Sequence, residues 1–441
     1  MKTFRILSAG LLVVASAAIA SAVTTTIHIT GSTAFRGATM TAIEHLMIAG
    51  GTTYQSCYYT GDASSSLNGA NIAILSGTVT GVGPVVVKAH WTGSTGGIQT
   101  LVQNITDSNW LANATFASSA AIAVTGGAGG ATVASLGGNT DSAAIADITM
   151  EDSHQASTGF TATTLTETQV GVIVFEWVAN NGAPTTVANI TPLQVQSLVS
   201  ATAVLSQFTG NSSDSGVAVY AAGRNFDSGT RLSELAESGV GVFGNVQQVQ
   251  VTNNGTIGVT GNVTGIRLYP SETVLGIHFG NGTSGYSSGG TLGKTLATPG
   301  SNGGSVTGDE GAGWLIGYLG RNDAVTAVSH LTGGNATNTA HRLTWNGVAD
   351  WTAGTSTISG GEGVVADDTP VTEGLYTAWE YEWLAYRGTF ADGNQAAGSK
   401  EKTLADAIAT QIISTDAAVS GTLLGAMHVS RPIEGGAISH N

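Results

Sequence analysis

The chain has 441 residues, and its 29 acidic against 14 basic side chains give a formal net charge of −15 at pH 7. This excess of negative charge disfavours nucleic acid and anionic membranes as partners, so local donors must hold any bound anion. A single cysteine excludes an internal disulfide, and stability must come from the large core that a chain of this length can bury.

The first 22 residues have the pattern of a secretory signal peptide. Two basic residues precede an apolar run over residues 6–19, and the small residues 20–22 follow it. This order predicts cleavage before Val23 and a periplasmic or secreted protein. The only cysteine, Cys57, lies far from the place where a lipid would be attached, so no lipid anchor is expected.

Apolar periodicity then alternates between strand and helix patterns. Strands are expected over residues 25–30, 84–91 and 172–178, and helices around residues 40–47, 98–105, 192–198 and 404–412. Thr191 and Pro192 form a cap and a first-turn proline at one of these helices. Alternation of this kind predicts an α/β fold with largely parallel strands.

Five segments rich in Gly, Ser, Thr, Ala and Asn interrupt this alternation. They cover residues 51–83, 112–139, 253–263, 280–313 and 332–368. We interpret them as long surface loops or irregular hairpins, and residues 421–441 as a tail or an edge strand.

The most informative segment begins after the β-rich run that starts at Val217. Arg224 to Thr230 reads Arg-Asn-Phe-Asp-Ser-Gly-Thr, and a helix-like stretch begins at Leu232. Such a junction delivers an Arg, hydroxyl groups and a Gly to the first turn of a helix. Backbone N–H groups, the positive end of the helix dipole and a guanidinium together suit an anion.

Three other segments have related chemistry. Gly31 to Phe35 and Gly93 to Gly97 each place small hydroxyl residues between a strand and a helix, and Asp147 to Ser153 follows a short apolar run. Several helix N-termini directed at one point can hold a tetrahedral oxyanion. A carboxylate such as Asp152 accepts a hydrogen bond from a protonated ligand and repels an unprotonated one, which would separate hydrogen phosphate from sulfate.

In order and spacing, these segments resemble the phosphate-binding proteins of ABC phosphate transporters. Arg224 to Thr230 is similar to the family's Arg-x-x-x-Ser-Gly-Thr segment, and Gly93 to Gly97 to its Gly-Ser-Ser-Gly-Gly turn. Ser32 to Phe35 resembles its first loop, and Asp147 to Asp152 its Asp-Phe-Gly-Ala-Ser-Asp segment. Ala34 stands where the family has a hydroxyl residue, and acidic Glu151 is a departure that would weaken anion affinity.

The resemblance implies a two-lobed type II periplasmic-binding-protein fold with Gly/Thr-rich loop insertions. The first lobe would comprise residues 23–172 and 372–441, and the second residues 173–371. The implied ligand-binding residues are Thr33, Ala34, Phe35, Ser94, Thr95 and Asp152 of the first lobe, and Arg224, Ser228, Gly229 and Thr230 of the second.

The resemblance also implies a monomeric receptor that delivers phosphate or a similar oxyanion to an ABC permease in the membrane. It implies no reaction and no cofactor. Scattered histidines without a paired spacing give no indication of a metal site.

Several other patterns support different interpretations. Gly285 to Gly289 matches a hydrolase nucleophile elbow with Ser287 as nucleophile, but no convincing strand precedes it. Gly239 to Gly244 and Ser288 to Thr295 imitate nucleotide-binding glycine loops in the wrong context. The aromatic cluster over 376–386 fits core packing better than a sugar platform. A secreted adhesion protein with a degenerate pocket is the main alternative function.

Overall fold

The computed structural model describes residues 24–62, 64–116, 119–126, 130–201, 203–258, 260–300, 310–329, 340–353, 364–388 and 399–441. The predicted signal peptide lies outside these residues. Over the described ranges, the structure contains no helix that is both long and apolar enough to cross a membrane.

One mixed sheet of 13 strands runs through both halves of the molecule, in the order β11-β12-β17-β9-β21-β8-β1-β4-β3-β2-β6. In addition, β18 pairs with β9, and β10 pairs with β18. Its strands are β1 (Thr25–Gly31), β2 (Gln55–Tyr59), β3 (Ile72–Val79), β4 (Gly83–His90), β6 (Ala131–Val133), β8 (Ile148–Glu151), β9 (Thr166–Ala179), β10 (Asn189–Ile190), β11 (Ala203–Val204), β12 (Ala218–Ala222), β17 (Gly313–Gly320), β18 (His341–Trp345) and β21 (Trp379–Tyr386). The chain therefore has the predicted α/β fold.

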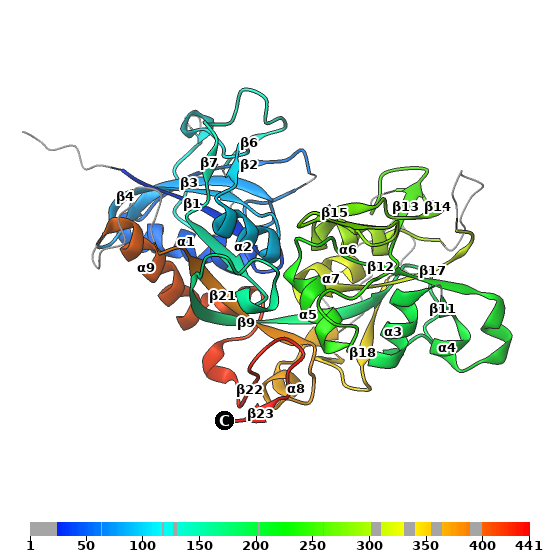
Figure 1. Cartoon of the computed structure of the whole chain (residues 1–441). Helices are drawn as coiled ribbons and strands as arrows, with labels where there is room; N and C mark the ends of the chain where they lie inside the picture. The colour runs from blue at the N-terminus through cyan, green and yellow to red at the C-terminus, as the bar shows by residue number, and fades with distance from the viewer. Residues whose placement is uncertain are drawn as a thin grey trace, which may run out of the picture.

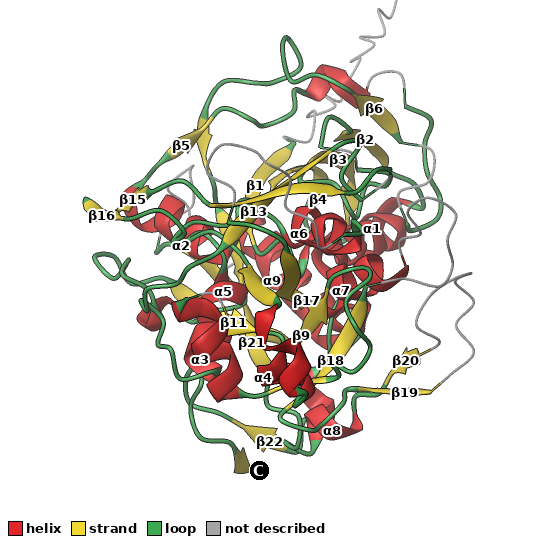
Figure 2. Cartoon of the chain, turned by 90° about the vertical axis from the view of Figure 1, so that its right-hand side faces the viewer, coloured by secondary structure: helices red, strands yellow, loops and turns green. Residues whose placement is uncertain are grey.

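Helices cover this sheet in two lobes, and β9 and β21 lie where the two lobes meet (Figure 1). They are α1 (Arg36–Gly51), α2 (Ser94–Gln103), α3 (Pro192–Ser200), α4 (Ser206–Thr209), α5 (Gly229–Glu237), α6 (Gly289–Ala297), α7 (Arg321–Ser329), α8 (Thr369–Thr372) and α9 (Lys400–Ser414). The first lobe holds α1, α2 and α9, and the second holds α3 to α7. The helices α3 and α4 lie at the far end of the second lobe and face the viewer in Figure 2.

Short hairpins and strand pairs decorate both lobes. They are β5 (Thr106–Asp107) with β7 (Ala144–Ile145), β13 (Val249–Asn253) with β14 (Val263–Leu268), β15 (Glu272–Val274) with β16 (Ile277–Phe279), β19 (Trp351–Ala353) with β20 (Val364–Ala366), and β22 (Val429–Ser430) with β23 (Ser439–His440). The predicted tail over 421–441 contains the last of these pairs. Single 3-10 turns begin at Asn113, Gln155, Ser212, Asp416 and Leu424.

The strand β9 belongs to both lobes. Thr166 to Val174 pairs with β21, which continues through β8 into the first lobe, whereas Phe175 to Ala179 pairs with β17 of the second lobe. The predicted lobe boundary at residue 172 falls within this strand. We keep the boundaries at 172 and 372 as a prediction.

The prediction of largely parallel strands was wrong for the sheet as a whole. Parallel pairing joins β1 to its neighbours β4 and β8, and β12 to β17. Antiparallel pairing joins β2, β3 and β4, and also joins β9 and β21 to their partners. The sheet is mixed because a meander precedes β4 and because both crossover strands run against their neighbours.

Four of the Gly-rich segments contain strands or helices that their loop-like composition had hidden. The segment 112–139 contains β6, which pairs with β2, and the other three contain elements with buried apolar side chains. The buried residues Ile72 to Leu75 form part of β3 inside the sheet, so 51–83 is not a surface loop. Leu292 and Leu296, four residues apart, are buried on α6 within 280–313. The segment 332–368 contains β18, which pairs with β9. In these three segments a few buried apolar side chains decide the structure despite many Gly neighbours.

Other local predictions were confirmed. Thr191 caps α3 in a full capping box with Gln194, and Pro192 occupies the first turn. Tyr376 and Trp379 of the aromatic cluster are buried in the main core, as core packing requires.

Candidate functional site

Arg224 lies directly after β12 and is 1% exposed. Its Nε donates to the carbonyl oxygen of Tyr286 at 3.0 Å and its Nη2 to that of Ser287 at 3.1 Å. The same Nη2 donates to Thr33 Oγ1 at 3.2 Å, which joins the second lobe to the first. Within the part of the chain that the structure describes, Nη1 has no hydrogen-bond partner. A buried, unpaired guanidinium nitrogen is costly, and an anion would satisfy it.

The helix α5 begins at Gly229, three residues before the predicted start. Ser228 is its N-cap, and Ser228 Oγ accepts from Arg231 N at 3.2 Å. Thr230 Oγ1 donates to Asp152 Oδ2 at 2.9 Å across the two lobes. A Cβ atom on Gly229 would lie 2.0 Å from Asp152 Oδ1, so only glycine permits this approach.

Asp152 follows β8 and also contacts the start of α2. Ser94 Oγ donates to Asp152 Oδ1 and accepts from Asp152 N at 3.0 Å. Gly93, with φ of 100°, is the N-cap of α2, and Gly96 N donates to the carbonyl oxygen of Asp227 at 3.1 Å. Thr95 is buried, and among the described residues its Oγ1 has no partner. The N-termini of α2 and α5 therefore meet at Asp152.

The predicted first loop reaches the same place through Thr33 alone among its side chains. Phe35 is the N-cap of α1, and its N donates to Ser32 Oγ at 3.1 Å, while its ring packs against Gly171 in the core. Ala34 packs against Gly320. Thr33, the residue before Ala34, provides the hydroxyl group of this loop that accepts a hydrogen bond from Arg224.

The structure thus brings Thr33, Ser94, Asp152, Arg224 and Thr230 into one hydrogen-bonded group, with Thr95, Ser228 and Gly229 directly beside it. Their role in binding a ligand stays a prediction.

Several residues that fix Arg224 were not found from the sequence. Its carbonyl oxygen accepts from Arg231 Nη1 at 2.9 Å and from Gln248 Nε2 at 3.1 Å. Its backbone N donates to Tyr318 Oη at 3.2 Å, and Tyr318 Oη donates to Gln248 Oε1 at 3.0 Å. These partners are distant in sequence, and no local pattern marks them.

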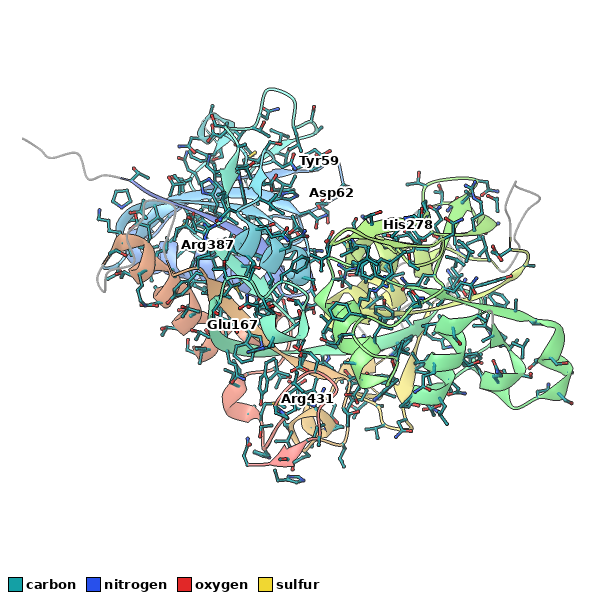
Figure 3. The ribbon with its side chains drawn as sticks, in the orientation of Figure 1. Tyr59, Asp62, Glu167, His278, Arg387 and Arg431 are labelled. Atoms are coloured by element: carbon teal, nitrogen blue, oxygen red, sulfur yellow. The ribbon has the colours of Figure 1, made fainter. Side chains whose placement is uncertain are left out.

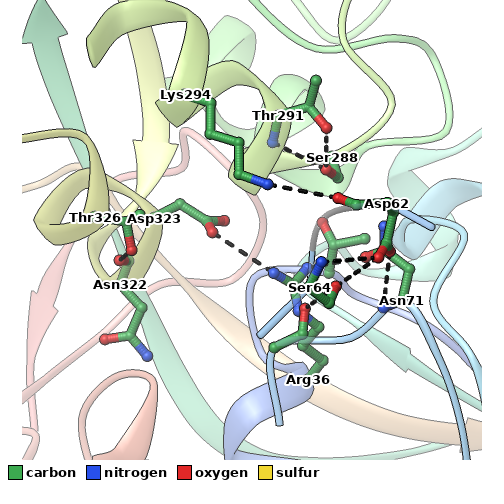
Figure 4. Close-up of polar contacts among 12 residues, drawn as sticks. Arg36, Asp62, Ser64, Asn71, Ser288, Thr291, Lys294, Asn322, Asp323 and Thr326 are labelled. Atoms are coloured by element: carbon green, nitrogen blue, oxygen red, sulfur yellow. Dashed lines mark hydrogen bonds and ion pairs between the residues drawn. The ribbon is translucent and has the colours of Figure 1, made fainter. Parts of the chain in front are cut away.

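The start of a second helix, α6, lies close to Arg224. From the sequence, this segment was interpreted only as an imitation of a nucleotide-binding glycine loop, so it was not predicted to belong to the site. Ser288, not Ser287, caps α6, and Ser288 Oγ accepts from Thr291 N at 3.2 Å. Asp323 of α7 lies against this turn, because a Cβ atom on Gly289 would be 2.0 Å from its Oδ2. Arg36 of the first lobe forms an ion pair with Asp323 at 3.8 Å (Figure 4).

A further cross-lobe contact appears in the same region (Figure 4). Lys294 Nζ of α6 donates to the carbonyl oxygen of Asp62 at 3.5 Å. Arg36 Nη1 donates to Asn71 Oδ1 at 3.3 Å within the first lobe. Two polar contacts in this region, Arg36 with Asp323 and Lys294 with Asp62, therefore join the lobes in addition to the hydrogen bond between Arg224 and Thr33.

Burial shapes the ionisation of the acids near Arg224. Burial raises the pKa of Asp152, although hydrogen bonds from Ser94 and Thr230 and the charge of Arg224 oppose this effect. Burial, with the charge of Glu272, raises the pKa of Asp227 to about 6. The hydrogen bonds from Ser94 and Thr230 and the charge of Arg224 favour the ionised form of Asp152, whereas burial favours the protonated form.

The expected harm from Glu151 does not follow from its surroundings. Burial raises its pKa well above the ordinary value, and the nearby carboxylates of Glu167, Glu382 and Glu434 raise it further. Figure 3 shows Glu167 on β9 in the first lobe. The raised pKa favours the protonated, uncharged form of Glu151, and the effect of Glu151 on anion affinity stays a prediction.

Together these groups make a donor-rich site between the lobes. It offers Arg224 Nη1, Thr95 Oγ1 and the backbone N–H groups of the first two residues of α2 and of α5, because the N–H groups of Gly96 and Arg231 already have partners. Such a set suits an oxyanion of several oxygens. Among the described residues, no group of His, Cys, Asp and Glu has the arrangement of a metal site.

Comparison with known proteins gives similarity in structure alone. No family model and no curated protein matches the chain. A Clostridium perfringens protein, assigned as a phosphate ABC transporter substrate-binding protein and solved with bound phosphate, is 12% identical with a TM-score of 0.40. The alignment covers 90% of this chain and 98% of that one.

An ABC-type phosphate transport receptor from Vibrio cholerae is 11% identical, also with a TM-score of 0.40, and the alignment covers 90% of this chain and 99% of that one. The chain is similar to both proteins over most of its length. At these TM-scores the similarity supports no inference about ligand or partner, and the site's own geometry must do so.

Proposed function

We propose that this chain is an exported solute receptor that binds phosphate, or a closely related tetrahedral oxyanion, between its two lobes. The resemblance of its motifs to those of phosphate-binding proteins extends the proposal to delivery of the anion to an ABC permease. The receptor binds its ligand without chemical change.

The single observation that carries the proposal is the state of Arg224. Its guanidinium is buried and makes three hydrogen bonds, yet Nη1 is left without a partner among the described residues. Evolution of a merely structural arginine would favour full pairing, because each unsatisfied buried donor costs about 1–3 kcal/mol. An oxyanion held by the starts of α2 and α5 would complete the set.

The acid at the site supports phosphate in particular. Asp152 contacts both helix starts through Ser94 and Thr230. A ligand that carries a proton can donate to this carboxylate, whereas sulfate at neutral pH can only repel it.

Titration calorimetry of the whole chain with inorganic phosphate tests the proposal. We expect Arg224→Ala to weaken binding by roughly 100-fold or more, as for loss of one partner of a buried charge pair. Arg387→Ala is the matched control, because Arg387 lies in the first lobe and donates to Asn104 Oδ1 and to the carbonyl oxygen of Ala146, outside the site.

A chain that binds no phosphate at millimolar concentration would contradict the proposal and favour the adhesion alternative. Equal affinity in the wild type and in Arg224→Ala would remove the site from between the lobes.

A further inference from the structure

An apolar cavity of about 250 Å³ opens beside the oxyanion site. Thr95 and Phe160 line it from the first lobe, and Phe226, Phe243 and Leu275 from the second. Its walls are thus mostly aromatic and aliphatic. Phe243 is 57% exposed and Leu275 46% exposed, so large apolar groups face water here.

Two residues connect the lining of this cavity to the residues of the oxyanion site. Thr95 is the second residue of α2, and its buried, unpartnered Oγ1 belongs to the donor set of the site. Phe226 lies between Arg224 and Asp227 in the segment that leads into α5. The Phe226 ring is fixed on one side by the Arg231 guanidinium, 4.0 Å from its centroid.

The turn of the hairpin β15–β16 has a conformation that is unfavourable for its first residue, Leu275, but places this leucine in the cavity wall. Its two-residue loop is Leu275-Gly276, with φ of 54° and 77°. Turns with two positive φ angles strongly favour Asn or Gly at the first position, and a leucine there is strained. Leu275 nevertheless reaches the opposite lobe, because a Cβ atom on Gly159 would lie 2.6 Å from Leu275 Cδ1.

We infer that the preferred ligand is an organic phosphate monoester or phosphonate whose ring-sized apolar group occupies this cavity. The inference rests on the proposed function, since the phosphate or phosphonate group takes the oxyanion position. The volume is sufficient, because an apolar cavity of about 150 Å³ accommodates benzene. Inorganic phosphate would leave the cavity's apolar walls without a contact.

Phenylphosphonate and methylphosphonate are the probes, because both keep a P–OH group and only the first carries a ring. Calorimetry on the whole chain is expected to show phenylphosphonate binding at least tenfold more tightly than methylphosphonate. In Leu275→Asn that ratio is expected to fall to about threefold or less. Thermal stability should not fall in this variant, because Asn suits the turn.

Leu375→Asn is the matched control, since Leu375 is 65% exposed and lies outside the cavity. Phe243→Ala is a second variant that removes a cavity wall without touching the turn, and it should also lower the ratio.

Equal binding of the two phosphonates, with inorganic phosphate still bound, would overturn this inference and leave the proposed function standing. A ring preference that survives both Leu275→Asn and Phe243→Ala would overturn the assignment to this cavity. Failure of phosphate and of both phosphonates to bind would instead refute the proposed function.

Discussion

Glu151 and Asp152 are adjacent carboxylic acids at the end of β8, and both are buried, yet their surroundings differ completely. Asp152 receives hydrogen bonds from Ser94 and Thr230 and lies in the field of Arg224. Glu151 faces the carboxyl groups of other acids, which raise its pKa well above the ordinary value. Burial alone therefore does not determine the role of an acid, because its neighbours decide whether its charge is usable.

The acids around Glu151 come from three further elements. Glu167 lies on β9, Glu382 on β21, and Glu434 in the C-terminal segment, where its Oε2 accepts from Ser157 Oγ. Glu167 also pairs with His154 at 3.2 Å. Several carboxyl groups surround Glu151 on this side of β8, while the Asp152 side meets the ligand in the proposed function.

The largest effect on phosphate affinity is expected from a substitution that forces the start of α5 away from Asp152. Gly229→Ala would place a methyl group 2.0 Å from Asp152 Oδ1, so the start of α5 must move away. We expect phosphate affinity to fall by about 100-fold or more, because a shift of this size breaks several contacts of the site at once. Calorimetry measures the change.

Gly216→Ala is the control for Gly229→Ala, since a Cβ atom there would meet nothing within 4 Å. Phosphate binding that is unchanged in Gly229→Ala would show that the ligand does not depend on the contact between α5 and Asp152.

A smaller effect on ligand binding is expected from removing only the charge of Asp152, the residue proposed to distinguish protonated from unprotonated anions. In Asp152→Asn the amide can donate to an unprotonated oxyanion as well as accept from a protonated one. The preference for phosphate over sulfate should narrow by about tenfold, which is about 1.4 kcal/mol. Competition calorimetry at pH 7 would measure both anions, and an unchanged ratio would exclude Asp152 as the reader.

The smallest effect on binding is expected from Glu151→Gln, which should change phosphate affinity by less than about threefold because the raised pKa of Glu151 favours its uncharged form. Its effect on stability should depend on pH. Above the unfolded pKa near 4.5 the unfolded chain releases a proton that the native chain keeps, so wild-type stability falls as pH rises towards the raised native pKa.

Glutamine removes that loss, so the melting temperature of Glu151→Gln should exceed that of the wild type by a few degrees at pH 8 and match it at pH 4.5. Glu373→Gln, at a half-exposed position, is the control. An identical melting difference at both pH values would mean that Glu151 is ionised in the native chain.

The strand-to-helix junctions of the site could be predicted because their signals are local. Arg224 follows an apolar strand, and Ser228 and Gly229 have the residue types that begin a helix. The α/β class likewise followed from alternating periodicity. The mixed pairing of the sheet did not, because strand direction depends on the path of the chain between strands.

The supporting parts of the site could not be predicted, because they depend on long-range contacts. Gln248 and Tyr318 hold Arg224 from 24 and 94 residues away along the chain. The start of α6 was hidden by a Gly/Ser-rich stretch, and the raised pKa of Glu151 depends on its burial and on acids from β9, β21 and the C-terminal segment. Sequence patterns report a residue's own chemistry but not the groups that the fold brings to it.

The sharing of β9 between the lobes sets a mechanical rule for the molecule. The strand β9 forms backbone hydrogen bonds with strands of both lobes, so the lobes are not joined by a flexible linker. Any movement of one lobe away from the other must therefore bend β9 and the strands paired with it. The register of β21 against β9 shifts between Glu382 and Trp383, and such irregularities are where a ribbon bends most easily. That point includes Glu382, one of the acids that raise the pKa of Glu151, so bending there would also change the surroundings of Glu151.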